Sequence, residues 1–268
     1  FSKKVSFPLE AGEWEIIDRD VWFFGGIKIR LITLVQTENN KIVAFREFQE
    51  GNLSGGYQSD LNMAIVEYLY KNKYDGCYTR PEYTLLKKYR KGNSHNCLTI
   101  NHIDPSKEIY TPDDPDSYID RMRIRSYIED NNLELPNNML SSTHAYFSRI
   151  VSNYLYTAVY IDSPQRLGAS ENNFKSEETS EYHPSNINKY PEYKKHMDKF
   201  IEISSLRHME FEKIVNAKKR HKLEFININS NEVKDDNILD QLKKLNTLYK
   251  NGVLTKEEFD KAKKKILD

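Results

Sequence analysis

The sequence predicts an α+β protein in which an antiparallel or mixed sheet is packed by a long amphipathic helix and followed by a C-terminal two-helix hairpin. Three observations predict this class. Strand-like runs pair up before residue 162, an apolar stripe at helical spacing extends over about 191–217, and 236–268 carries the start and stop signals of two short helices. We therefore divide the chain into a body, 1–228, a polar linker, 229–235, and the hairpin, 236–268.

The composition favours a folded protein without a general affinity for nucleic acid. The 268 residues include 40 basic and 40 acidic side chains, so the formal net charge is zero, and 12% of the residues are aromatic. The aromatic residues suffice for a packed core. Because a zero net charge gives no general attraction to nucleic acid, we expect no nucleic-acid partner. The longest apolar stretch, 21–35, is interrupted by Lys28 and Arg30 and is too short for a membrane-spanning helix.

Residues 1 to about 55 predict strands. The run 27–35 alternates at first and then becomes apolar on both faces, and 42–48 is strand-like again. The segment 38–41 (ENNK) suits a turn that tolerates positive φ. We expect a β-hairpin here.

The middle of the chain mixes helix and strand signals. Residues 60–69 have apolar side chains at helical spacing, with a strand as the open alternative, and a loop containing both cysteines follows. Residues 94–104 predict a strand. Asp114-Pro115 predicts the start of a helix that runs to about Asn132, since proline is favoured in the first turn.

A second strand pair is predicted at 143–151 and 155–161. Both faces of this pair are apolar or aromatic, which favours a central position in the sheet under helices. Residues 162–190 are polar and loop-like. A stretch of that length without secondary structure indicates a functional loop or a poorly ordered excursion.

The strongest helix signal begins near Pro191. Its stripe consists of Tyr193, Met197, Phe200, Ile201, Ser204, His208, Phe211 and Val215. Residues at these three- and four-residue steps share one helix face, so we expect the helix to pack on the sheet. His208 lies on the stripe, where a hydrogen-bonded core histidine is the favoured interpretation over a ligand. Residues 223–228 could add a last short strand.

The C-terminal segment predicts two helices joined by a glycine turn. Asp236 or Asn237 caps the first helix, Asn251-Gly252 ends it, and Thr255 with Glu258 forms a capping box for the second. The expected interface is apolar: Leu239, Leu242, Leu245, Leu248, Leu254, Phe259 and Ile266. A unit of this length cannot bury enough apolar surface to be stable alone. We therefore expect it to pack against a partner, either a second copy of the chain or another protein.

Two cysteines, Cys77 and Cys97, are separated by twenty residues. A bridge over such a loop would contribute about 3 kcal/mol and persists in oxidising compartments. Two free thiols in a cytosolic protein are the alternative. The chain starts at Phe1 and not at Met. Together these features favour a periplasmic or secreted protein whose signal peptide has been removed.

No catalytic, cofactor-binding or metal-binding motif stands out. The glycine pairs lack phosphate-binding spacing, and no G-x-S-x-G elbow surrounds Ser141, Ser142 or His144. Asn101-His102, on a predicted strand beside Cys97, is the one candidate ligand contact. The alternative, which we favour, is a histidine bonded to backbone near the bridge.

A basic run, 217–222 (AKKRHK), closes the long helix. Cations are favoured at a helix C-terminus, and that structural role is the preferred interpretation. Residues 189–268 hold 19 Lys and Arg against 14 Asp and Glu, whereas 1–188 holds 21 against 26. Contact of the basic helical end with a membrane, or with the acidic body of another copy, is a second hypothesis.

The segment 236–268 resembles the SHOCT family of short C-terminal domains. The resemblance rests on Leu242 and Leu245, on the turn Gly252-Val253-Leu254-Thr255, and on Glu257-Glu258-Phe259. It implies a small helical hairpin on an otherwise unrelated bacterial protein, with a role in oligomerisation or docking and with no catalytic residue.

The body is similar to uncharacterised exported bacterial proteins that pair a first cysteine with a later Cys-Trp-x-Val-Asn-His segment. Here the segment reads 97–102 (CLTINH), without the tryptophan, and 160–168 (YIDSPQRLG) is a later marker. The resemblance implies an envelope location. We expect a non-enzymatic binding or assembly protein of the bacterial envelope; the alternative is a small envelope enzyme or ligand-binding protein with a site around His102.

Overall fold

We describe a computed structural model of the chain. It describes residues 7–24, 27–52, 83–90, 94–110, 122–148, 154–170, 179–216, 255–256 and 259–260. The chain divides into two compact units, Phe1–Ile226 and Asn227–Asp268, and each is described by itself. The predicted helix at 60–69, the predicted strand at 223–228, the linker and most of the hairpin lie outside the described residues.

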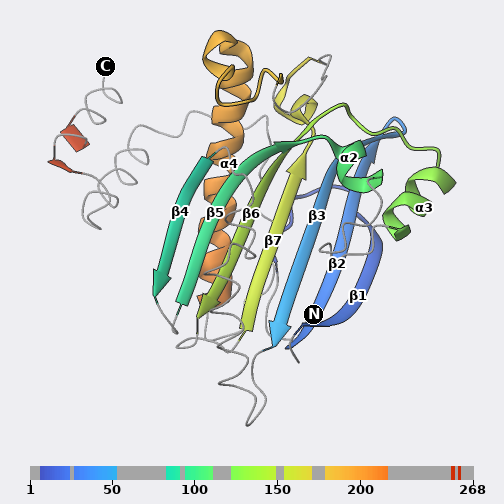
Figure 1. Cartoon of the computed structure of the whole chain (residues 1–268), viewed down its shortest axis with the longest axis horizontal. Helices are drawn as coiled ribbons and strands as arrows, with labels where there is room; N and C mark the ends of the chain where they lie inside the picture. Colours follow the sequence, from blue (N-terminus) through green and yellow to red (C-terminus); the bar gives the residue numbers. More distant parts are fainter. Residues whose placement is uncertain are drawn as a thin grey trace. The chain divides into compact units, whose positions relative to one another are not determined.

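The described part of the first unit is built on one seven-stranded antiparallel sheet (Figure 1). Its strands are β1 (Glu15–Phe24), β2 (Ile27–Glu38), β3 (Lys41–Asn52), β4 (Tyr83–Arg90), β5 (Ser94–Ile103), β6 (Met139–Ser148) and β7 (Tyr154–Asp162). Their order is β1-β2-β3-β7-β6-β5-β4, and every neighbouring pair is antiparallel. The sheet and its helices confirm the α+β class.

The β2–β3 hairpin confirms the first predicted turn. Asn39 and Asn40 have φ angles of 51° and 60°, a conformation that asparagine tolerates better than most residues. β2 continues to Glu38 and β3 to Asn52, beyond the predicted ranges, because the ladder runs from the pair Glu38 and Lys41 to the pair Lys28 and Asn52. β7 and β6 are likewise central, as their apolar faces predict.

The helices lie on the two faces of the sheet. α4 (Pro191–Asn216) crosses the far face in Figure 1, behind β5 and β6, whereas α2 (Pro105–Tyr110) and α3 (Met122–Asp130) lie on the near side toward β1 to β3. Strand alternation explains this division. Arg46 and Tyr160 face α4, and their neighbours Phe45 and Ile161 face α2 and α3.

The core is split by the sheet. On the α4 face, Phe211 and Val215 pack against Phe48, Tyr156 and Tyr160, and Phe7 stacks on Phe48 with 4.7 Å between ring centroids. Farther along the same face, Met197 and Phe200 pack against Leu98, Ile100 and Leu140. On the other face, Ile109 of α2 and Ile124 and Ile128 of α3 pack against Val35 and Phe45.

Several predicted boundaries were wrong. β4 occupies part of the predicted cysteine loop, and α2 falls where no helix was predicted. The described part of the predicted 114–132 helix is α3, which ends at Asp130, and β6 begins four residues before the expected start. Short 3₁₀ helices, η2 (Pro164–Leu167) and η3 (Ile187–Lys189), interrupt the predicted 162–190 loop. Tyr182 and Ile187 are buried in the core, so the described part of that segment is packed structure.

Candidate functional site

Charged side chains from four parts of the body meet beneath α4. Arg46 lies in β3, Asp162 ends β7, Arg207 is on α4, and Glu10 precedes β1. Each of the four is at most 4% exposed. The strand register explains the meeting, because Arg46 pairs with Tyr160 and Ala44 pairs with Asp162. Residues two apart on a strand share a face, so both charges project toward α4.

Each carboxylate in this cluster bridges both arginines. Arg46 Nη2 donates to Asp162 Oδ1 at 2.7 Å and Arg46 Nε donates to Glu10 Oε2 at 3.1 Å. Arg207 Nη1 donates to Asp162 Oδ2 at 2.8 Å, and Arg207 Nη2 pairs with Glu10 Oε1. Arg166, on η2, adds a 2.5 Å bond to Asp162 Oδ1 from the edge of the cluster. The carboxylates are therefore fully engaged in internal contacts.

The pKa values follow from these contacts. Burial alone would raise the pKa of Asp162, but the guanidinium groups of Arg207 and Arg46 lower it well below its usual range. The pKa of Glu10 is lowered in the same way, against its own burial, by Arg46 and Arg207. The pKa of Arg46 is raised, because the two carboxylates outweigh the effect of burial. All these groups are charged at neutral pH.

Aromatic rings close the cluster. The Arg46 guanidinium lies 4.8 Å from the Trp14 ring centroid and 5.3 Å from that of Tyr160, and Arg207 lies 4.8 Å from the Tyr160 ring. Tyr160 Oη donates to the Pro8 carbonyl at 2.9 Å. These contacts hold the segment before β1 against the sheet and α4. The cluster thus acts as an internal cross-link, with its charges turned toward one another.

A chain of hydrogen bonds lies beside the charged cluster. Ser142 Oγ and His144 Nε2 are 3.1 Å apart, and His144 Nδ1 and His208 Nδ1 are 3.1 Å apart. His208 Nε2 lies 2.8 Å from Asn96 Oδ1, and the Asn96 amide donates to Glu212. β6, α4 and β5 each supply part of this chain. It joins the helix to the two strands it covers.

The donors in this chain point in one direction. Because the Asn96 amide nitrogen donates to the Glu212 carboxylate, its oxygen accepts from His208 Nε2. With both imidazoles neutral, His208 Nδ1 accepts from His144 Nδ1, and His144 Nε2 accepts from Ser142. Burial, together with His208, Arg207 and Arg46, lowers the pKa of His144 well below its ordinary value.

The Ser142–His144 contact has the geometry of a serine activated by a histidine. Both side chains are completely buried under α4, however, so the Ser142 hydroxyl is closed to a substrate in this conformation. The same holds for the charged cluster. The two buried networks position the helix, and we assign them a structural role.

The predicted ligand contact is split between the two faces of the sheet. His102 lies on the α4 face, 2% exposed, with its ring centroid 6.3 Å from that of His183 in the 162–190 segment. Asn101, the preceding residue on β5, projects to the opposite face, because successive strand residues alternate. The structure therefore brings His102 to the expected loop and separates Asn101 from it. The predicted core role of His208 is confirmed by its bonds to Asn96 and His144.

The other predicted residues are placed only in part. Cys97 is completely buried in β5 beside Ala145, and Cys77 lies outside the described residues, so the bridge stays a prediction. Of the expected hairpin interface, Phe259 is described and Leu239, Leu242, Leu245, Leu248, Leu254 and Ile266 are not. The Phe259 amide donates to the Thr255 carbonyl at 3.0 Å, as in the helix predicted to start at Thr255.

The charged cluster was not predicted. One signal for it exists in the sequence: Arg46 occupies an inward strand position between Ala44 and Phe48, and Arg207 adjoins the apolar helix stripe. A charge at a core position predicts a buried partner of opposite sign. The pattern does not say which of the many carboxylates in the sequence is that partner.

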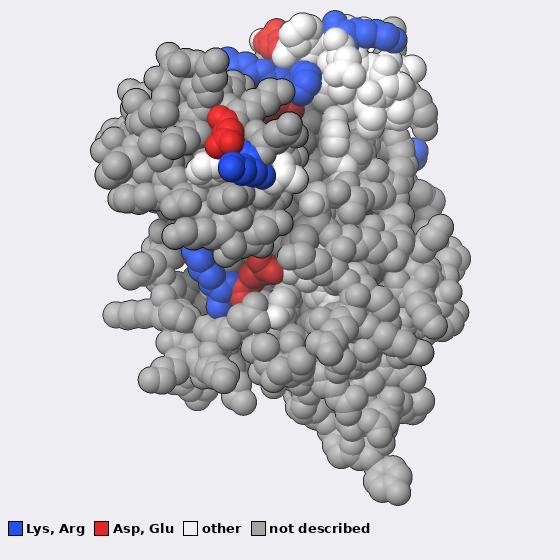
Figure 2. All heavy atoms as spheres, turned by 90° about the vertical axis from the view of Figure 1, so that its left-hand side faces the viewer, with Lys and Arg blue, Asp and Glu red and all other residues white. Residues whose placement is uncertain are grey.

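Other site types find little support in the described ranges. No three metal-ligating side chains gather there, and no helix there is long and apolar enough to cross a membrane. On the side of the molecule shown in Figure 2, basic and acidic side chains of the described residues occur near one another, without a large patch of either sign.

The comparisons with known proteins concern the C-terminal segment. A search of curated proteins and a search of solved structures both found no match. Residues 240–267 match the family model of the short C-terminal domain, SHOCT, within the 236–268 segment that resembles it.

Proposed function

We propose that this protein is a non-enzymatic binding or assembly protein of the bacterial cell envelope, and that its C-terminal hairpin mediates oligomerisation or docking. The observation that carries the proposal is the match of residues 240–267 to the short C-terminal domain. A two-helix unit of this size buries too little apolar surface to be stable alone. Its apolar stripe therefore needs a partner.

The hairpin supplies a self-complementary surface for this role. Leu239, Leu242, Leu245 and Leu248 recur every three residues, so they form one oblique ridge along the first predicted helix. Two such stripes can pack against each other by the ridges-into-grooves geometry of helical bundles. A second copy of the chain is therefore the partner we favour, and another envelope protein is the alternative.

The body suits a supporting role. Its charges beneath α4 are neutralised internally, and its Ser142–His144 pair is closed. A rigid sheet cross-linked to a long helix can carry a hairpin without chemistry of its own. The envelope location rests on the predicted Cys77–Cys97 bridge, which an oxidising compartment would preserve.

Substitutions on the predicted stripe test the proposal in the full-length chain. Leu242→Asp with Leu245→Asp places two charges in the interface, and Lys243→Asp with Lys244→Asp is the matched control on neighbouring positions. We expect multi-angle light scattering to give an oligomer for the wild type and the control, and a monomer for the leucine variant. A monomeric wild type would rule out self-association, and the partner would then be another protein.

A ligand site around His102 is the second candidate function. The nearness of the His102 and His183 rings favours it, since two imidazoles from different segments then converge. His102→Ala should abolish a ligand-induced rise in melting temperature if this site binds a ligand. A variant that lowers only the stability of the free protein would leave the first proposal standing.

A further inference from the structure

A pocket opens on the sheet face opposite α4, between the strands and the helices α2 and α3. Ten side chains line it: Thr33, Phe45, Glu47, Ile103, Pro105, Glu108, Ile109, Ile124, Met139 and Ile161. Its cavity measures about 50 Å³. Since one water needs about 10–15 Å³ of such space, the pocket can take the end of a small ligand and not a whole large one.

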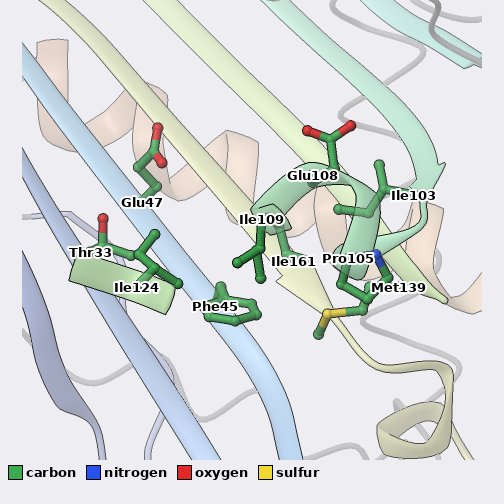
Figure 3. A pocket seen from close by; sticks show the side chains of 10 residues that line it. All are labelled: Thr33, Phe45, Glu47, Ile103, Pro105, Glu108, Ile109, Ile124, Met139 and Ile161. Carbon is green, nitrogen blue, oxygen red and sulfur yellow. The ribbon is translucent and has the colours of Figure 1, made fainter. Parts of the chain in front are cut away.

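The lining of this pocket is divided between oxygen atoms and hydrocarbon. In Figure 3 the Thr33 hydroxyl and the carboxylates of Glu47 and Glu108 point toward the upper side of the view, whereas Phe45 and Met139 lie below them. Thr33 and Glu47 are cross-strand partners on β2 and β3, which places their side chains next to each other. Glu108 reaches the pocket from α2.

Thr33 provides the observation that points to a ligand. Its side chain is 2% exposed, and its Oγ1 has no hydrogen-bond partner. A buried hydroxyl without a hydrogen-bond partner lowers the stability of the fold, and a ligand group that bonds to it would remove that loss. Glu47 is also buried in the pocket wall and accepts a 2.9 Å bond from Gln49 Nε2.

The charge of the lining selects the kind of group. Among the ten residues there are two carboxyl groups and no basic side chain, so an anionic ligand would be repelled. An ammonium group carries three N–H donors and no acceptor, so it suits the Thr33 hydroxyl and the Glu47 carboxylate beside it, and its positive charge suits the second carboxylate, Glu108. The apolar floor suits a short alkyl chain.

We infer that this pocket binds the end of a small primary alkylamine, with the ammonium group held by the cross-strand neighbours Thr33 and Glu47 and attracted by the charge of Glu108 on the other side of the pocket. The alkyl chain lies against Phe45 and Ile109. This site is on the opposite sheet face from the two buried networks and from His102, and none of its lining residues belongs to the hairpin that carries the proposed assembly role.

Calorimetric titration of the full-length protein with n-butylamine, n-butanol and butyrate at pH 7 tests the inference. We expect the amine to bind at least about tenfold more tightly than the alcohol, and butyrate to bind least well. Glu47→Gln should weaken amine binding about tenfold while leaving butanol binding unchanged. Glu129→Gln, an exposed carboxyl on α3 outside the pocket, is the matched control.

Two results would overturn the inference: equal affinities for amine and alcohol, including no binding of either, or unchanged amine binding in Glu47→Gln. If circular dichroism shows that Glu47→Gln does not fold, Glu108→Gln replaces it, because that carboxyl is exposed on α2. We then expect about a threefold loss of amine affinity, and no loss would contradict the site.

Discussion

Arg46 and Asp162 form a 2.7 Å charge-assisted hydrogen bond between adjacent strands, with both side chains buried beneath α4. The bond is one link in a cluster that also holds Arg207 and Glu10, so β3, β7, α4 and the segment before β1 are joined at one point. This cross-link joins the long helix to the centre of the sheet by buried polar contacts.

Removing one charge of this cluster should lower the stability of the fold. Asp162→Asn keeps the shape of the side chain but leaves Arg46 and Arg207 with one carboxylate fewer in a buried site. We expect a loss of about 3–5 kcal/mol in the free energy of unfolding, measured by urea denaturation. Asp198→Asn, which breaks the exposed Lys194–Asp198 pair on α4, is the control and should change the stability little. Similar stabilities for the two variants would refute a structural role for the cluster.

The histidine pair should make the protein less stable in mild acid. The pKa of His144 is lowered in the folded state by burial first and then by His208, Arg207 and Arg46. The unfolded chain therefore takes up a proton that the folded chain does not, so stability is full above the unfolded pKa of about 6.5 and falls as the pH drops below it. The lowered pKa values of Asp162 and Glu10 add a further loss at lower pH, below about 4.

Denaturation curves between pH 8 and pH 5 check the histidine contribution. His144→Gln removes the titrating group and should flatten the dependence of stability on pH, although the variant is less stable at pH 8. The pKa of His196, on α4, is also lowered mainly by burial. The pH dependence of stability is therefore measured for His196→Gln as well and compared with that of His144→Gln. If the stability of His144→Gln depends on pH as steeply as that of the wild type, His144 is not the titrating group.

Two buried hydroxyls should respond to removal in opposite ways. Thr33→Val replaces an unpartnered hydroxyl by a methyl group and should stabilise the free protein by about 1 kcal/mol. Ser142→Ala removes the donor to His144 and should destabilise it by about 1–3 kcal/mol. Thermal and urea unfolding of both variants measure the contrast. A destabilised Thr33→Val would mean that the hydroxyl already has a partner in the free protein.

The predicted bridge has a direct chemical test. Alkylation of denatured protein without reductant should label neither Cys77 nor Cys97, and reduction should expose both to the reagent. Peptide mass spectrometry reads the result. Labelling of both thiols in protein isolated without reductant would favour the cytosolic alternative.

Local signals predicted much of the fold. The asparagine pair at Asn39 and Asn40 marked the hairpin turn, and the apolar stripe from Tyr193 to Val215 marked α4, because turn chemistry and helical periodicity are properties of neighbouring residues. β4 was missed because it lies among turn signals and charged residues. α2 is only six residues long and leaves too short a pattern to detect.

The buried networks could not be derived in the same way. Ser142 and His144 are two residues apart on one strand, so their shared face was predictable from alternation. Their link to His208 spans 64 residues, and that of Arg46 to Asp162 spans 116. Such contacts depend on strand order, and the sequence alone leaves several strand orders open.

The mass of the protein in solution tests the proposed function most directly. Light scattering on the full-length chain and on a chain ending at Ser230 compares the protein with and without its short C-terminal domain. The account predicts a defined oligomer for the full-length chain and a folded monomer for the shorter one. Identical monomeric masses would contradict self-association through the hairpin.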